Sequence, residues 1–187
     1  MEGERVVIYI DGGNIYRALF KEAIVKGTRI PAFVSTGQKV DYNKFVQFLA
    51  GNRKFEDKKY YIGIIRDFDK SEKSKKMVQA QQKFLSGLEN DGFNIQRGKI
   101  VYDHKIREKG VDVKMAIDLV IGCFENKYDT AIIVSSDTDL IPAIKYAQSK
   151  GKNIEYVGFS NHTSLAMIKE CDNQRILREI ELAGFIS

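Results

Sequence analysis

Short apolar runs rich in β-branched residues recur along the chain, separated by longer stretches in which apolar residues follow a helical spacing. Several of the short runs are almost continuously apolar, which is typical of strands buried on both faces, as in a parallel sheet covered by helices. The candidate strands are 6–10, 60–65, 94–96 with 99–102, 130–134 and 153–157.

The segments between these strands predict helices over 42–50, 71–90, 111–124 and 139–149. Asp41 and Ser71 precede the first two, and their side-chain oxygens are suited to accept a hydrogen bond from the first turn of a helix. We expect Asp139 or a neighbour to begin the last helix. The stretch 26–40 has weak periodicity and is expected to form a long loop or a small flap.

Alternation of strands and helices is typical of an α/β fold with a parallel sheet. We therefore predict one three-layer α/β/α domain over 1–187, with a central, mainly parallel sheet of about five strands. Its core is expected at about 5–160, with 161–187 packing on that core as a C-terminal extension. The apolar residues of this extension are suited either to the core or to a homo-oligomer interface.

The composition narrows the functional classes. The chain has 187 residues, of which 43% are hydrophobic and 29% charged, so a disordered protein is excluded. Cys123 and Cys171 lie far apart, which excludes a disulfide scaffold and a cysteine-based metal site. The first apolar run is too short for a membrane span or an export signal, so we expect a cytoplasmic protein without membrane association. The net charge of +5 is compatible with a polyanionic partner.

Acidic residues follow the predicted strands at positions that the topology brings together. Asp11 ends the first strand, Asp137 and Asp139 follow the strand at 130–134, and Asp112 begins the helix at 111–124. In open α/β sheets, ligands bind beyond the carboxyl ends of the strands. We therefore expect these four carboxylates at one edge of the sheet.

Converging carboxylates repel one another unless a cation lies between them, and ligation by oxygen alone suits Mg²⁺ or Mn²⁺. One or two such ions polarise a phosphodiester and lower the pKa of a bound water. Each acid also has a purely structural interpretation. Asp11 is suited to a turn, Asp139 to a helix cap, and Asp112 to a helix N-terminus. Asp118 either orients a metal ligand without binding the metal itself or is only exposed to solvent.

Three motifs in this order resemble the NYN domain family (LabA-like). The segment 7–14 (VIYIDGGN) resembles the opening motif, and 109–112 (KGVD) followed by Asp118-Leu119 resembles the second. The segment 134–140 (VSSDTDL) resembles the third, with Ser136 in the place where the family usually has glycine. The likeness covers residues 6 to about 160.

This resemblance implies a PIN-like nuclease fold and a Mg²⁺- or Mn²⁺-dependent ribonuclease. Asp11, Asp112 and Asp137 match the acids expected to hold metal, and Asp139 matches the second acid of the third motif. We take these four as the candidate catalytic and metal-binding residues. The candidate substrate-binding residues are Asn14, Arg17, Arg66, Lys109, Ser135 and Ser136.

Basic residues flank the predicted acidic edge. Residues 66–83 hold six Lys or Arg against three Asp or Glu, and Lys109 comes shortly before Asp112. Such cations suit the phosphates of RNA, either single-stranded or in structured loops. The leading hypothesis is a metal-dependent endoribonuclease. Two alternatives stay open: a non-catalytic RNA-binding or regulatory module, and an aspartyl-phosphate phosphatase or receiver-like domain phosphorylated on Asp11.

Overall fold

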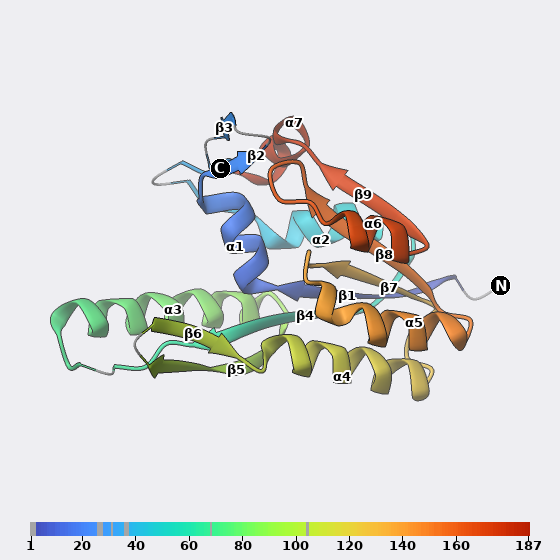
Figure 1. The fold of residues 1–187 in the computed structure, drawn as a ribbon, viewed down its shortest axis with the longest axis horizontal. Helices are drawn as coiled ribbons and strands as arrows, with labels where there is room; N and C mark the ends of the chain where they lie inside the picture. Colours follow the sequence, from blue (N-terminus) through green and yellow to red (C-terminus); the bar gives the residue numbers. More distant parts are fainter. Residues whose placement is uncertain (1–2, 26–27, 31, 36–37, 68, 104) are drawn as a thin grey trace.

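A twisted sheet forms the centre of the computed structural model (Figure 1), which describes residues 3–187 except 26–27, 31, 36–37, 68 and 104. The described residues form seven strands in the main sheet, in the order β6-β5-β4-β1-β7-β8-β9. These strands are β1 (Arg5–Asp11), β4 (Lys54–Ile64), β5 (Asn94–Asp103), β6 (Lys105–Lys109), β7 (Thr130–Val134), β8 (Asn153–Phe159) and β9 (Asn173–Leu177).

The sheet is parallel except at one edge, where β6 pairs antiparallel with β5. The predicted α/β class and the mainly parallel sheet are therefore confirmed, and all five predicted strands are present. The edge strands β6 and β9 were not predicted. Strand β9 comes from the expected C-terminal extension and pairs with β8, so this extension adds a strand to the sheet.

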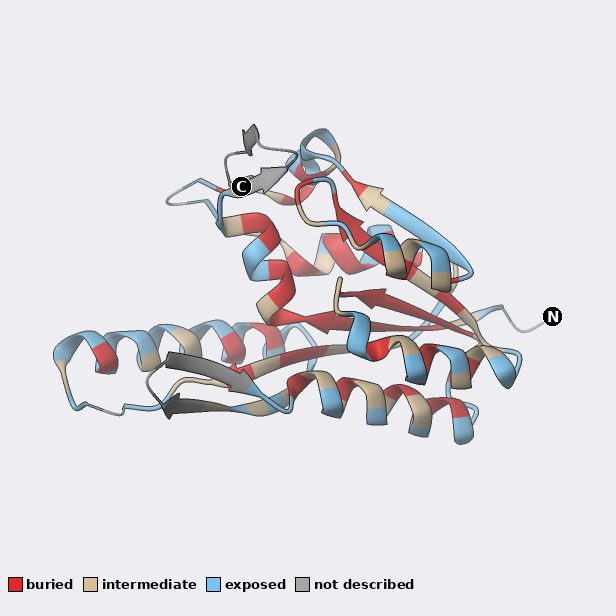
Figure 2. Ribbon diagram, in the orientation of Figure 1, coloured by how far each residue is buried: buried red, intermediate tan, exposed pale blue. Residues whose placement is uncertain are grey.

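Helices cover both faces of the sheet (Figure 2). One apolar core includes α1 (Gly12–Phe20), α2 (Tyr42–Ala50) and the C-terminal end of α3 (Glu72–Asn90). The other core includes α4 (Val111–Phe124), α5 (Ile141–Ser149) and α6 (Leu165–Glu170). The chain ends with α7 (Glu179–Leu182) and a 3-10 turn, η2 (Ala183–Phe185), which returns to the first core. The predicted three-layer arrangement is thus confirmed.

The segment 26–40, predicted to form a long loop or a small flap, contains a short strand. A small antiparallel sheet pairs β2 (Ala23–Val25) with β3 (Thr28–Ile30), an arrangement that agrees with a small flap and differs from a loop without strands. Weak periodicity hid this strand, because a strand of three residues carries too little pattern to detect. The predicted loop also includes 26–27, 31 and 36–37, which lie outside the described residues.

Side-chain caps fix several helix starts. Asp41 Oδ1 accepts a hydrogen bond from Lys44 N at 2.9 Å, and Ser71 Oγ accepts one from Ser74 N at 3.0 Å, as the sequence predicts. After β7, however, the cap is Asp137, whose Oδ1 accepts from Asp139 N at 2.9 Å. This bond begins a short 3-10 helix, η1 (Thr138–Leu140), and α5 follows at Ile141.

Among the described residues, none of the helices is both long and apolar enough to cross a membrane.

Candidate metal centre

The acidic cavity lies at the carboxyl edge of two neighbouring strands. Strands β1 and β7 pair in parallel with Ile10 opposite Val134, so the chain leaves both strands at the same level. Helix α4 begins at the same edge. A cavity of about 170 Å³ results, and the described residues that line it are Asp11, Arg17, Val111, Asp112 and Asp137. Three acids from separate parts of the chain therefore face one small volume.

Asp11 is the most buried of these acids, with 8% of its surface exposed. Its Oδ1 accepts a hydrogen bond from Asn14 N at 2.9 Å, and its Oδ2 accepts one from Ser135 Oγ at 3.0 Å. Burial raises the pKa of this carboxyl, while the two hydrogen bonds and the charge of Arg17 oppose the rise. Asp11 is thus fixed in orientation at an energetic cost that a nearby cation would relieve.

Among the described residues, Asp112, Asp137 and Asp139 form a group whose carboxylates could hold a metal ion. One carboxylate oxygen of each lies within 4.8 Å of the other two, and the first two side chains are half-buried while Asp139 is exposed. Such a set offers only hard oxygen donors, and a carboxylate retains lone pairs for a cation even when it accepts one hydrogen bond. The donors therefore fit Mg²⁺ or Mn²⁺.

The two serines after β7 have different contacts. Ser135 is buried, donates to Asp11, and accepts a hydrogen bond from Asp137 N at 3.2 Å, so it connects two of the acids. Ser136 Oγ lies 2.8 Å from Tyr156 Oη and donates to the His162 carbonyl at 2.9 Å. Its hydroxyl therefore links the turn after β7 to β8 and to the segment that follows β8.

The basic residues predicted to bind substrate differ in their distance from the acidic cavity: one lines it, and the other two are not among its described lining residues. Arg17 lines the cavity, and its charge opposes the rise in the pKa of Asp11. Arg66 is exposed after β4 and Lys109 is exposed at the end of β6, and neither is among the described residues that line the cavity. Asn14 is buried, and its backbone N–H donates a hydrogen bond to the Asp11 side chain, which caps the start of α1.

Asp118 lies further along α4 and contacts other groups. Its Oδ2 accepts a hydrogen bond from Tyr61 Oη at 2.9 Å, and its Oδ1 is 3.6 Å from Lys114 Nζ. The described residues that line the acidic cavity do not include it. The structure thus places Asp118 against β4 and separates it from the four candidate ligands.

The sequence of the chain matches a family model described as "NYN domain" over residues 5–178. The chain belongs to the NYN domain family. NYN domains are part of the PIN-like nuclease superfamily, so the predicted resemblance is confirmed.

Two further comparisons place this NYN domain among its relatives. It is 32% identical over 88 residues to an uncharacterized protein of Methanocaldococcus jannaschii, a match that covers 47% of this chain and 33% of that protein. The chain thus matches about a third of the length of this curated relative. A crystal structure of a protein of unknown function from Vibrio parahaemolyticus has the same fold, with a TM-score of 0.65, 18% identity and 94% of each chain covered.

Two neighbours of the acids in this NYN domain were not among the candidates from the sequence. Val111 lines the cavity beside Asp112. His162 is half-buried, and burial together with the charge of Arg17 lowers its pKa, while Asp11 opposes this shift. The available signal was the isolated position of His162 after β8, but a lone histidine in a polar loop does not by itself indicate a site.

Proposed function

We propose that this NYN domain is a metal-dependent endoribonuclease, with Asp11, Asp112, Asp137 and Asp139 as the ligands of one or two Mg²⁺ or Mn²⁺ ions. The observation that carries the proposal is the spacing of the acids. Three carboxylates lie within 4.8 Å of one another, and Asp11 lines the same cavity as two of them. Without a cation, such a cluster costs electrostatic free energy, so its assembly supports a role in binding one.

A bound divalent ion would polarise the phosphodiester, lower the pKa of a water molecule and stabilise the leaving oxygen. The protein's own residues position these groups. Ser135 and the Asn14 N–H hold the two oxygens of Asp11, so this carboxylate presents a fixed face to the cavity. Arg17 supplies a cation at the cavity wall that suits a phosphate oxygen.

RNA is the proposed substrate because of the family and the charge distribution. NYN domains belong to a nuclease superfamily. Exposed lysines, namely Lys73, Lys75 and Lys76, lie on the first turns of α3. Lys109 and Arg66 lie on the segments before α4 and after β4. These cations are suited to guide a phosphate backbone toward the acidic cavity.

Cleavage of a 5′-labelled single-stranded RNA in Mn²⁺, Mg²⁺ and EDTA tests the proposal. We expect cleavage only with metal, and a loss of at least about a hundredfold for Asp11→Asn and Asp137→Asn, because ligand loss removes several kcal/mol of transition-state stabilisation. Asp118→Asn is the matched control. It removes a carboxylate from α4, the helix that also carries Asp112, but outside the acidic cavity, and the amide oxygen still accepts from Tyr61.

Full activity in Asp11→Asn and Asp137→Asn would contradict the proposal. Metal-independent RNA binding without cleavage would favour the regulatory alternative. Incorporation of phosphate from acetyl phosphate at Asp11 would favour the phosphatase or receiver-like alternative.

A further inference from the structure

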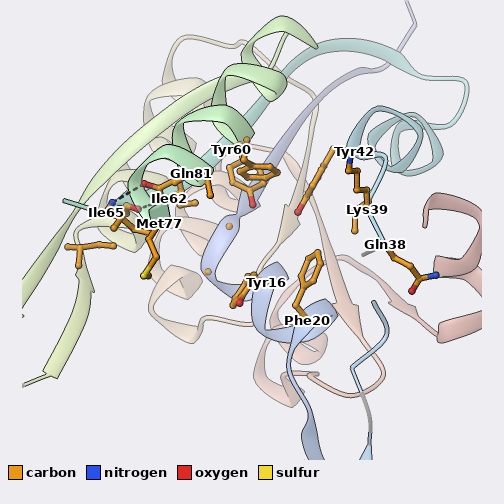
Figure 3. Close-up of a pocket in the computed structure, with 17 residues that line it drawn as sticks. Tyr16, Phe20, Gln38, Lys39, Tyr42, Tyr60, Ile62, Ile65, Met77 and Gln81 are labelled. Carbon is orange, nitrogen blue, oxygen red and sulfur yellow. Dashed lines mark hydrogen bonds between the residues drawn. The ribbon is translucent and has the colours of Figure 1, made fainter. Parts of the chain in front are cut away.

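A second, larger pocket lies beside the acidic cavity and has a different character (Figure 3). Its volume is about 660 Å³, within the range of small-molecule sites. Its walls come mainly from α1, β4, α3, the first residue of α2 and the segment that precedes α2. We call it the aromatic pocket, because its walls include the rings of Tyr16, Phe20, Tyr42, Tyr60 and Phe84.

The rings form two opposing walls. Tyr16 and Phe20 on α1 stack with centroids 5.4 Å apart and planes 20° apart, which makes one flat surface. Tyr42, Tyr60 and Phe84 pack edge to face on the other side, with centroids 5.6 to 5.8 Å apart. Figure 3 shows Tyr42 and Tyr60 across the pocket from Tyr16 and Phe20.

The aromatic pocket is partly open to solvent. Tyr16 is 49% exposed and Met77 is 45% exposed, whereas Tyr60 in the opposite wall is 2% exposed. Single exposed apolar side chains are common, but a cluster around a cavity of this size is typical of a binding site.

Helix α1 connects this pocket with the acidic cavity. Asp11 lines the cavity, and the next two residues, Gly12 and Gly13, line the aromatic pocket. Arg17 and Tyr16 are also neighbours in sequence, about 100° apart around the helix. Arg17 faces the acids while Tyr16 faces the aromatic pocket, so a ligand bound across α1 would contact both sites.

The charges around the aromatic pocket identify the class of ligand. The described residues that line it include Lys39 and no acid. Lys21 Nζ lies 5.4 Å from the centroid of the Tyr16 ring. The flat surface of Tyr16 and Phe20, together with nearby lysines, suits a planar base attached to a phosphate backbone, as in proteins that bind single-stranded nucleic acid.

We propose that the aromatic pocket receives one unpaired nucleobase of the RNA strand whose phosphodiester lies in the acidic cavity. This inference rests on the proposed function and specifies its substrate: an RNA that is unpaired next to the cleaved bond. The base would contact the exposed Tyr16 ring, and Lys39 would face the backbone phosphate that follows.

Equilibrium binding tests this proposal without cleavage. Fluorescence anisotropy of a labelled single-stranded RNA octamer is measured in EDTA and in Ca²⁺ for the wild type and for Tyr16→Ala, Tyr16→Phe and Ala80→Phe. We expect at least about fivefold weaker binding for Tyr16→Ala, which loses the ring, and for Ala80→Phe, which fills the pocket. Tyr16→Phe keeps the ring and is expected to bind like the wild type.

Phe124→Ala is the matched control. Phe124 is 81% exposed and is the last residue of α4, roughly 18 Å along the helix axis from Asp112. Its removal deletes an exposed aromatic ring far from both cavities. Binding equal to that of the wild type is therefore expected.

Abasic substitutions locate the base. Each nucleotide of the octamer is replaced in turn by an abasic residue, and we expect one position to weaken wild-type binding at least about fivefold. The same substitution is expected to change little in Tyr16→Ala, because the contact is already lost.

Several outcomes would overturn the inference. These are equal binding by Tyr16→Ala and Phe124→Ala, abasic effects that persist unchanged in Tyr16→Ala, and absence of RNA binding in both EDTA and Ca²⁺. A change in molar mass by light scattering in Tyr16→Ala would instead assign the pocket to a protein interface. Base-dependent binding without Mn²⁺-dependent cleavage would refute the proposed function alone. Cleavage that is insensitive to Tyr16→Ala and to every abasic position would refute only the role of the aromatic pocket in binding a base.

Discussion

Ser135 Oγ donates a hydrogen bond to Asp11 Oδ2 at 3.0 Å, and these residues are 124 positions apart in the sequence. The contact exists because β1 and β7 are parallel neighbours with Ile10 opposite Val134. It fixes the carboxylate that lies deepest in the acidic cavity, and it also lowers the pKa of that carboxyl against the effect of burial.

Ser135→Ala is expected to shift the acid limb of the cleavage rate to higher pH. Loss of the hydrogen bond further raises the pKa of Asp11, so a higher pH is needed to ionise this carboxyl. The free energy of unfolding is expected to fall by about 1–3 kcal/mol, since a buried acceptor loses its donor. The pH dependence of kcat/KM for RNA cleavage measures the shift of the acid limb.

Ser136→Ala is the control for Ser135→Ala, because the Ser136 hydroxyl bonds to Tyr156 and His162 and not to Asp11. An equal shift of the acid limb in Ser136→Ala would refute the role given to Ser135.

Asp11→Asn is expected to stabilise the protein in EDTA while abolishing cleavage. Burial raises the pKa of Asp11 in the folded protein. Stability is therefore lost as the pH rises from the ordinary pKa of aspartate through the raised one, and the neutral amide avoids this loss. Asparagine also caps a helix well. Thermal unfolding at neutral pH checks the prediction.

Added Mn²⁺ provides the second half of that experiment. Mn²⁺ is expected to raise the melting temperature of the wild type by preferential binding to the folded state, and to raise that of Asp11→Asn less. An Asp11→Asn variant that is less stable than the wild type in EDTA, or equally stabilised by Mn²⁺, would contradict the account.

Gly12→Ala is expected to destabilise the fold by about 1–3 kcal/mol through overpacking. A Cβ at this position would lie 2.6 Å from Tyr60 Cε1 and 2.8 Å from the Tyr61 carbonyl oxygen, which belongs to the backbone. Urea unfolding checks this. Gly87→Ala on α3 meets nothing within 4 Å and is expected to stabilise its helix by up to about 1 kcal/mol. Equal effects of the two substitutions would rule out the close contact at Gly12.

Asp129→Asn is expected to lower stability at neutral pH but not in strong acid. Asp129 accepts hydrogen bonds from the Arg5 backbone and guanidinium, which lower its pKa to about 2. The stabilisation is therefore complete above the ordinary pKa of aspartate, about 3.9, and is lost as the pH falls toward 2. Its size is expected to be about 1 kcal/mol or less, because the side chain is 44% exposed.

The measurement is the free energy of unfolding of both proteins across this pH range. Asp67→Asn, at an exposed carboxylate after β4, is the control. A difference between wild type and Asp129→Asn that stays constant with pH would contradict the assignment.

The buried elements of the fold were predictable from apolar patterning, and the polar edge elements were not. Strands β1 and β7 and the second half of β4, residues 60–64, are apolar on both faces, so their sequences are distinctive. Strand β9 has the sequence NQRIL, in which three residues are exposed, and it pairs with β8 alone. Polar edge strands carry little periodicity, so their pairing depends on the sheet already being present.

The location of the acids followed from topology, but their detailed contacts did not. Strand ends place Asp11 and Asp137 at one edge, and the structure shows both lining one cavity with Asp112. Their role as metal ligands stays a prediction. The helix cap by Asp137 depends on the turn after β7, and the aromatic pocket joins rings from four separate segments, so neither leaves a pattern in the sequence.

The source of the oxygen incorporated during RNA cleavage distinguishes attack by a metal-activated water from attack by the 2′-hydroxyl of the RNA. Single-turnover cleavage of single-stranded RNA in H₂¹⁸O with Mn²⁺ is followed by mass spectrometry of the products. We expect metal-dependent cleavage that places one ¹⁸O on the product phosphate and forms no 2′,3′-cyclic phosphate, with no products from Asp137→Asn. A cyclic phosphate, or equal cleavage by Asp137→Asn, would contradict this expectation.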